Sequence, residues 1–373
     1  MAGIYLHIPF CRQACTYCNF HFTTSLRFKD DVVKALAREA EMEKDYLNGE
    51  TINTIYFGGG TPSLIEIANL EFLIGNLFRN YPVAADAEIT LEANPDDITP
   101  DKLKAWKDIG INRLSIGVQS FFEEELRWMN RAHSAKLAVD SLQLARKEFV
   151  NITIDLIYGS PLLTDKMWKE NVERAIDLDI PHLSCYALTV EEKTPLHKSI
   201  AAHKTSGIDN DKQARQFLLL MQWLRGKGYA HYEVSNFAKP GFRSRHNSSY
   251  WKGEKYLGLG PSAHSYNGIE RRWNVANNNL YVKNSNKDNA QRETELLTTT
   301  QKLNEFIMIS LRTMEGMDLS KLEKEFGKHQ RERIEKQIKK FTSGNLIKLN
   351  NSLAQLTDEG MLRADGIAGE LFV

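Results

Sequence analysis

The chain lacks any long hydrophobic run. No stretch of about 18 apolar residues occurs, so the sequence predicts no membrane-spanning helix. It begins MAGIYLHIPF, without the positively charged segment that opens a secretory signal. We therefore expect a reduced, cytoplasmic protein rather than a disulfide-linked secreted one.

The chain also lacks an excess of charge of either sign. Lys and Arg together number 48, and Asp and Glu together also number 48. Proteins that bind nucleic acid broadly need a basic surface to neutralise phosphates, so no nucleic-acid partner is expected. The 373 residues are 42% apolar, which allows a sizeable core and two domains.

Cysteine is scarce, and its placement is informative. Three of the four cysteines, Cys11, Cys15 and Cys18, form C-x3-C-x2-C in HIPFCRQACTYC. A zinc site would need a fourth ligand at fixed spacing, and a disulfide framework is improbable for an odd triplet. The remaining Cys185 lies far away in an apolar stretch and is expected to be a buried small hydrophobe.

Three thiolates in one loop can hold three corners of a [4Fe–4S] cluster. A cluster with four protein ligands is an electron carrier, whereas three ligands leave one iron open to a small molecule. This incomplete set is typical of radical S-adenosylmethionine (SAM) proteins, in which the amino and carboxylate groups of SAM chelate the open iron. The cysteine loop therefore predicts a cluster, SAM and a reductant as partner, in preference to zinc.

Six short runs rich in β-branched residues alternate with helical patterns. The expected strands are 4–8, 54–57, 88–92, 113–117, 151–156 and 182–187. The expected helices are 29–46, 64–78, 100–109, 135–148, 167–178 and 211–227. Such alternation implies parallel strands with right-handed crossovers. The fold class is therefore α/β, a partial (β/α)6 barrel open on one side, with ligands at the carboxyl ends of the strands.

Candidate ligand-binding residues follow those strands. The glycines of GGGTP, Gly58–Gly60, let backbone approach the amino end of SAM because glycine has no Cβ. Tyr17 can lie against the adenine, and Glu92 can accept hydrogen bonds from an ammonium group or ribose hydroxyls. Further polar contacts are offered by Gln119, Arg131 and Asp155. The alternatives are a plain tight turn, a packing aromatic and satisfied buried polar groups.

The composition changes near residue 230, which predicts three regions. Residues 1–235 form the barrel, and a possible strand at 232–237 lies at its end. Residues 236–298 form an irregular connecting segment, which is rich in Gly and Asn from residue 258 onward. Residues 299–373 contain three helical patterns and two short strands, which indicate a winged-helix-like α+β domain. Such modules often bind DNA, but the neutral charge favours a packing role.

The connecting segment contains the motif HNSSYW. His246 and Tyr250 would share a face if the segment were helical, and in a loop both could still point into one pocket. His is a common axial ligand of haem iron and Tyr a rarer one. Trp251 offers a flat apolar face, and nearby arginines, Arg243 and Arg245, suit propionates. The alternative is an interface loop packed on the barrel mouth.

These motifs together resemble a known family. HIPFCRQACTYCNF, FGGGTP, LEANPDDIT, RLSIGVQSF, IDLIYG, HNSSYW and LTDEGMLRADGIAGEL resemble the HemW-type haem chaperones. These are relatives of oxygen-independent coproporphyrinogen III oxidase within the radical SAM superfamily. The resemblance implies SAM contacts at Tyr5, Tyr17, Gly59, Gly60, Thr61, Glu92, Gln119, Arg131, Asp155, Ala187 and His264. It also implies a haem site at His246, Asn247, Tyr250 and Trp251.

The sequence departs from the oxidase at two places. Phe20 stands where the oxidase has a fourth cysteine, and only ten residues precede Cys11, where the oxidase has a longer segment for its substrate. The resemblance therefore implies a haem chaperone that binds a cluster, SAM and haem, without turnover, and passes haem to an acceptor protein that could lie at a membrane. Coproporphyrinogen III decarboxylation and a related radical SAM methyltransferase activity remain alternatives.

Overall fold

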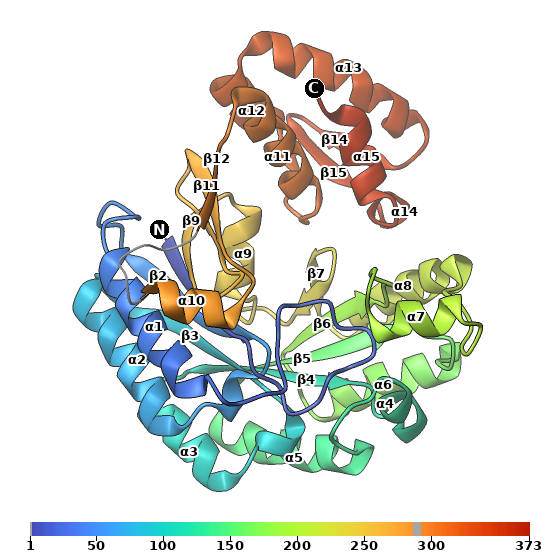
Figure 1. Cartoon of the computed structure of the whole chain (residues 1–373). Coiled ribbons are helices and arrows are strands. Elements are labelled where there is room, and N and C mark those ends of the chain that lie inside the picture. Colours follow the sequence, from blue (N-terminus) through green and yellow to red (C-terminus); the bar gives the residue numbers. More distant parts are fainter. Residues whose placement is uncertain (1, 286–291) are drawn as a thin grey trace.

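The computed structural model describes residues 2–285 and 292–373 and contains one large sheet and one small sheet (Figure 1). The large sheet has twelve strands in the order β12-β11-β10-β9-β1-β2-β3-β4-β5-β6-β8-β7. Its centre consists of β1 (Ala2–Ile8), β2 (Ile52–Gly59), β3 (Val83–Ala93), β4 (Arg113–Gln119), β5 (Asn151–Tyr158) and β6 (His182–Ala187). All six expected strands are thus confirmed.

Neighbouring strands from β1 to β6 are parallel and run in sequence order. The helices that connect them are α1 (Lys29–Met42), α2 (Ile67–Asn80), α3 (Pro100–Asp108), α4 (Glu123–Trp128), α5 (Ala135–Glu148) and α6 (Asp165–Asp177). Two further helices, α7 (Pro195–Ala201) and α8 (Asn210–Arg225), follow β6. β1 and β6 do not pair with each other, because β9 (Lys255–Leu259) pairs with β1 and β8 (Asn236–Ala238) with β6. The partial, unclosed barrel is confirmed.

Side chains alternate between the two faces of each strand, so that one face is apolar and the other is largely polar. Ile4, Leu6 and Ile8 of β1 are at most 1% exposed and belong to the apolar core. The alternate residues, such as Tyr5 and His7, are polar and lie on the opposite face of the strand. The apolar layer holds the barrel together, whereas the polar layer supplies groups that can bind ligands.

Residues 236–298 are more regular than expected. β7 (Ala230–Glu233) and β8 form a hairpin, and α9 (Arg245–Trp251) follows. β9, β10 (His264–Tyr266), β11 (Glu270–Asn274) and β12 (Arg292–Leu296) then extend the sheet beyond β1, with α10 (Asn278–Ser285) between the last two. Short polar strands with few apolar alternations give little periodic signal, which is why the sequence suggested irregular backbone.

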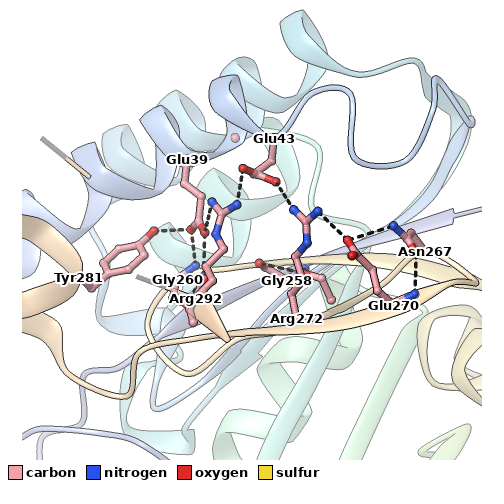
Figure 2. A network of polar contacts seen from close by, with 12 residues as sticks. Glu39, Glu43, Gly258, Gly260, Asn267, Glu270, Arg272, Tyr281 and Arg292 are labelled. Atoms are coloured by element: carbon pink, nitrogen blue, oxygen red, sulfur yellow. Dashed lines mark hydrogen bonds and ion pairs between the residues drawn. The ribbon is translucent and has the colours of Figure 1, made fainter. Parts of the chain in front are cut away.

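A buried carboxylate fastens this extension to α1 (Figure 2). Glu39 accepts hydrogen bonds from the backbone N–H of Gly260 at 2.8 Å, from the Tyr281 hydroxyl at 2.5 Å and from Asn274 at 2.7 Å. Arg292 of β12 forms ion pairs with Glu39 at 3.4 Å and with Glu43. Because Glu39 is only 4% exposed, these partners are needed to offset the cost of burying its charge.

The C-terminal region forms its own core around a three-stranded sheet. Its elements are α11 (Thr299–Leu311), β13 (Met317–Asp318), α12 (Leu319–Phe326), α13 (Lys328–Ser343), β14 (Ile347–Asn350), β15 (Leu353–Leu356), α14 (Asp358–Met361) and α15 (Ala364–Leu371). Arg225 of α8 forms an ion pair with Asp358 at 2.8 Å, and Tyr232 accepts a backbone hydrogen bond from Met314 at 3.0 Å. Among the described residues, no helix is long and apolar enough to cross a membrane.

Candidate functional site

A cavity of about 450 Å³ lies at the carboxyl ends of the barrel strands. Twelve of the residues predicted to bind the cluster or SAM line it: Cys11, Cys15, Tyr17, Cys18, Gly59, Gly60, Thr61, Glu92, Gln119, Arg131, Asp155 and Ala187. They come from the segments that follow or end β1 to β6, as parallel strands require. We call this cavity the cluster cleft.

The three cysteines lie on a loop that is tied down at several points. The Cys11 backbone N–H donates to the Thr23 carbonyl at 3.0 Å, which closes the base of the loop. The Thr16 N–H donates to the Met129 carbonyl at 3.1 Å, and the Thr16 carbonyl accepts from Leu196 at 2.8 Å. The thiols are therefore held at the mouth of the barrel rather than on a free segment.

The cysteine thiols are partly buried and unpaired by disulfides. Burial raises the pKa of Cys11 to about 11 and also raises the pKa of Cys18. The described residues contain no group of three His, Cys, Asp or Glu compact enough to hold a single ion. A cluster instead spreads its thiolate ligands around a larger body and removes their protons through the charge of the iron. Cys185 is 1% exposed in β6, as expected.

Two glycines let the chain pass close to the cysteine loop. Gly59 has φ of +108°, and a Cβ there would lie 2.6 Å from the His7 ring. A Cβ on Gly60 would lie 2.7 Å from the Phe10 carbonyl oxygen, because the Gly60 N–H donates to the Ile8 carbonyl at 2.8 Å. Only glycine fits this approach between β1 and β2.

Two carboxylates lie in the wall of the cleft. Glu92 accepts hydrogen bonds from the Tyr56 hydroxyl at 2.9 Å and from the Gly59 N–H at 3.1 Å. Burial, reinforced by the nearby Asp155 charge, raises the pKa of Glu92 to about 7. Burial likewise raises the pKa of Asp155 to about 6. A cationic ligand would favour the ionised form of both groups.

Arg131 and Gln119 line the cleft in positions with special geometry. The Arg131 Nε has no hydrogen-bond partner among the described residues although it is buried, so one donor is left for a ligand. Gln119 has φ of +68°, which places a non-glycine residue in the left-handed region beside a β-bulge. Strained backbone of this kind concentrates at functional sites.

Some cleft residues did not emerge from the sequence. Asn94, Ser115 and Tyr186 also line the cavity. Asn94 follows Glu92 in LEANPDD, so its place at a strand end could have singled it out. Ser115 and Tyr186 lie within strands, where the sequence offers no signal that distinguishes them from residues of the polar layer.

Two residues carried over from the resemblance lie outside the cleft lining. The Tyr5 ring stacks on Tyr56 and on His246, with centroid distances of 6.0 and 6.4 Å. His264 of β10 stacks on Trp273 of the neighbouring β11, with the ring centroids 6.0 Å apart. SAM contact by either residue stays a prediction.

The HNSSYW motif forms most of α9, so His246 and Tyr250 share one face of the helix. The Ser244 hydroxyl caps the helix, and the Glu88 carboxylate accepts the backbone N–H of Arg245 and of His246. The His246 ring is 1% exposed; its nitrogens lie 2.8 Å from the Thr54 hydroxyl and 2.9 Å from the Tyr250 hydroxyl. A metal could reach a ring nitrogen of His246 only if one of these bonds were released.

A second cavity, of about 520 Å³, lies beside α9 next to the C-terminal region. We call it the α9 groove. It is lined by Trp251, Arg243, Arg245, Phe306 and Ile309, among others, whereas Asn247 lines neither cavity. The Trp251 indole N–H is buried without a partner among the described residues, and the Arg312 guanidinium lies 5.5 Å from the Trp251 ring. An amphipathic ligand would meet both apolar surface and donors here.

Comparisons with known proteins agree with this architecture. Residues 5–175 match the radical SAM superfamily and residues 297–363 match the HemN C-terminal domain. The solved structure of coproporphyrinogen III oxidase (HemN) from Escherichia coli, a radical SAM enzyme, superposes with a TM-score of 0.85. That match covers all of this chain and 90% of the other, and its 24% identity establishes a shared fold.

Two curated relatives match over almost the whole chain, and a third matches over 70% of it. The heme chaperone HemW of Bacillus subtilis is 32% identical over 373 residues, which is 99% of this chain and 98% of that protein. HemW of Mycobacterium tuberculosis H37Rv is also 32% identical, over 99% of this chain and 94% of its own. HemW of Escherichia coli is 37% identical over 70% and 69% of the two chains. The chain therefore belongs to the HemW family of the radical SAM superfamily.

Proposed function

We propose that this protein is a cytoplasmic haem chaperone that also holds a [4Fe–4S] cluster and SAM. The observation that carries the proposal is the cluster cleft, where three thiols meet an unpartnered Arg131 Nε and two carboxylates. Membership of the radical SAM superfamily supports binding of the cluster and of SAM. Binding of haem is inferred from the relatives, which are named heme chaperones.

The cleft residues suit these cofactors. Cys11, Cys15 and Cys18 would ligate three irons and leave one for the amino and carboxylate groups of SAM. When bound, the cluster supplies one electron for cleavage of the sulfonium. Arg131 offers its Nε to a carboxylate, and ionised Glu92 offers charge to an ammonium group or acceptors to ribose hydroxyls.

We propose that haem binds at the HNSSYW segment, with His246 as the iron ligand and Trp251 as stacking surface. Burial lowers the pKa of His246 to about 3, so its imidazole is neutral, as a metal ligand must be. Arg243 and Arg245 line the adjoining α9 groove, where they could meet propionates after exchanging their present partners, Glu315 and Asp86. The acceptor is a haem-dependent apoprotein, soluble or at a membrane.

One anaerobic preparation tests the function. After reconstitution we expect about four irons per chain, an EPR signal perturbed by SAM, saturable haem binding and loss of haem to an apoprotein. The same sample, given coproporphyrinogen, SAM and reductant, should form no protoporphyrinogen, consistent with Phe20 at the fourth-cysteine position. Robust SAM-dependent decarboxylation would replace the carrier with the oxidase, and absence of haem binding would refute the chaperone.

A further inference from the structure

Two of the three cysteine sulfurs receive side-chain hydrogen bonds. The Arg131 Nη1 donates to the Cys15 Sγ at 3.3 Å, and the Thr61 hydroxyl donates to the Cys11 Sγ at 3.5 Å. Cys18 differs: burial is the main cause that raises its pKa, and the group that counteracts this rise most is the Phe20 backbone N–H rather than a side chain. Cys11 and Cys15 are thus the sulfurs whose environment is set by side chains.

Asn94 connects the two donors. Its Oδ1 accepts from the Arg131 Nη2 at 2.7 Å, and its Nδ2 donates to the Thr61 hydroxyl oxygen at 3.2 Å. The direction of these bonds is fixed by chemistry: a guanidinium only donates, so the amide oxygen must face it and the amide NH₂ must face Thr61. Asn94 itself touches no cysteine.

The bonds to Asn94 also determine which groups donate to the cysteine sulfurs. Because the Thr61 oxygen already accepts from Asn94, its proton is free to point elsewhere, and a thiolate bound to iron can only accept. Arg131 is held similarly: its Nη2 also donates to the Gly117 carbonyl at 2.7 Å, which leaves Nη1 aimed at Cys15. One amide therefore orients both donors.

We propose that Asn94 is a positioning residue that fixes Thr61 and Arg131 on the Cys11 and Cys15 sulfurs and thereby raises the reduction potential of the cluster. Reduction adds negative charge to the cluster and its sulfurs, and donors to those sulfurs stabilise the reduced form. The inference rests on the proposed cluster and adds a role for three residues around it. With this role, Arg131 acts on the cluster as well as on SAM.

The test is an EPR-monitored redox titration of the reconstituted full-length protein. Asn94→Ala should lower the equilibrium constant for reduction about tenfold, which is about 59 mV for one electron. Thr61→Val keeps the shape of the side chain and removes the hydroxyl, so it should shift the potential in the same direction. Thr16→Val is the matched control, since Thr16 lies in the cysteine loop but donates to the Trp128 carbonyl.

A triple variant separates positioning from direct action. If Asn94 acts through its two partners, Asn94→Ala should cause no further shift in a Thr61→Val, Arg131→Gln background. An undiminished shift in that background would overturn the positioning role. Should Asn94→Ala lose its cluster, the pair Thr61→Val and Thr16→Val still decides, because equal potentials for both would refute the inference.

The iron content of the parent protein distinguishes failure of the proposed function from failure of the positioning role of Asn94. A parent protein that binds no cluster refutes the proposed function, and this inference with it. A parent with a full cluster whose potential is unchanged in Asn94→Ala and Thr61→Val refutes the inference alone and leaves the proposed function standing.

Discussion

The Tyr250 hydroxyl lies 2.9 Å from one ring nitrogen of His246, one turn earlier on α9, and so occupies a position that iron would need. The other ring nitrogen faces Thr54 at 2.8 Å. Both nitrogens of this buried imidazole therefore have a hydrogen-bond partner within the protein.

Removing the Tyr250 hydroxyl should free His246. We expect Tyr250→Phe to bind haem as tightly as the parent or a few-fold more tightly, because the competing hydrogen bond is gone, whereas His246→Ala should shift the Soret band and weaken binding. Haem titrations followed by absorbance give both values. If Tyr250→Phe loses affinity for haem and His246→Ala does not, tyrosine is the ligand. If the variant that carries both substitutions binds haem like the parent, the haem site lies elsewhere.

The cluster should depend on three cysteines and not on the fourth. Cys15→Ser is expected to lose most of its iron after anaerobic reconstitution, because one corner ligand is missing. Cys185→Ser should keep it, since Cys185 lies buried in β6 outside the cleft. Iron and sulfide analysis provides the measurement, and equal loss in both variants would contradict the three-ligand assignment.

We expect the Glu92 carboxylate to strengthen SAM binding and, at the same time, to lower the stability of the folded protein at neutral and alkaline pH. Its folded-state pKa of about 7 lies above its ordinary value of 4.5, so the group favours the folded state below pH 4.5 and that contribution is lost as pH rises through 7. Glu92→Gln should therefore stabilise the cofactor-free protein at pH 8 by roughly 1–2 kcal/mol. The same substitution should abolish tight SAM binding.

The parent should also bind SAM more weakly as pH falls below 7, since protonated Glu92 loses its charge for the ligand. Chemical denaturation at pH 5 and 8, together with SAM titration, measures both effects. A Glu92→Gln variant that is less stable at pH 8 would show that the carboxylate is needed for the fold itself.

The buried Glu39 carboxylate should contribute strongly to the stability of the fold (Figure 2). Glu39→Ala leaves the Gly260 N–H and the Tyr281 hydroxyl without the carboxylate that accepts from them. It also removes one of the two acceptors of Arg292 and of Asn274, and such broken buried networks cost about 3–5 kcal/mol. Glu66→Ala removes an exposed pair with Lys29 and should cost less than about 1 kcal/mol. Urea unfolding compares the two, and similar midpoints would contradict the role given to Glu39.

The sequence predicts the barrel well because its strands have strong local signals. The β6 run at 182–187 and the α5 pattern at 135–148 match the observed elements residue for residue. The cleft also follows from sequence, since parallel strands bring their ends together whatever the loop lengths. Asn94 shows the limit: its position was visible, but its link to Thr61 and Arg131 depends on side-chain geometry.

Other features depend on tertiary contacts that no local pattern records. The α9 helix is seven residues long, and it is fixed by the distant Glu88 and Thr54, so the sequence left helix and loop equally open. The strands of the extension are specified by pairing with β1 and by the Glu39 network. The α9 groove exists only because the C-terminal region packs beside α9.

The place of β1 in the sheet has a consequence for synthesis on the ribosome. β1 lies between β2 and β9, and β9 is complete only when residue 259 has been made. Until then one edge of the strand that leads into the cysteine loop has unpaired N–H and C=O groups. Iron loading is thus expected to follow release of most of the chain, and a nascent chain stalled before residue 255 should acquire little iron.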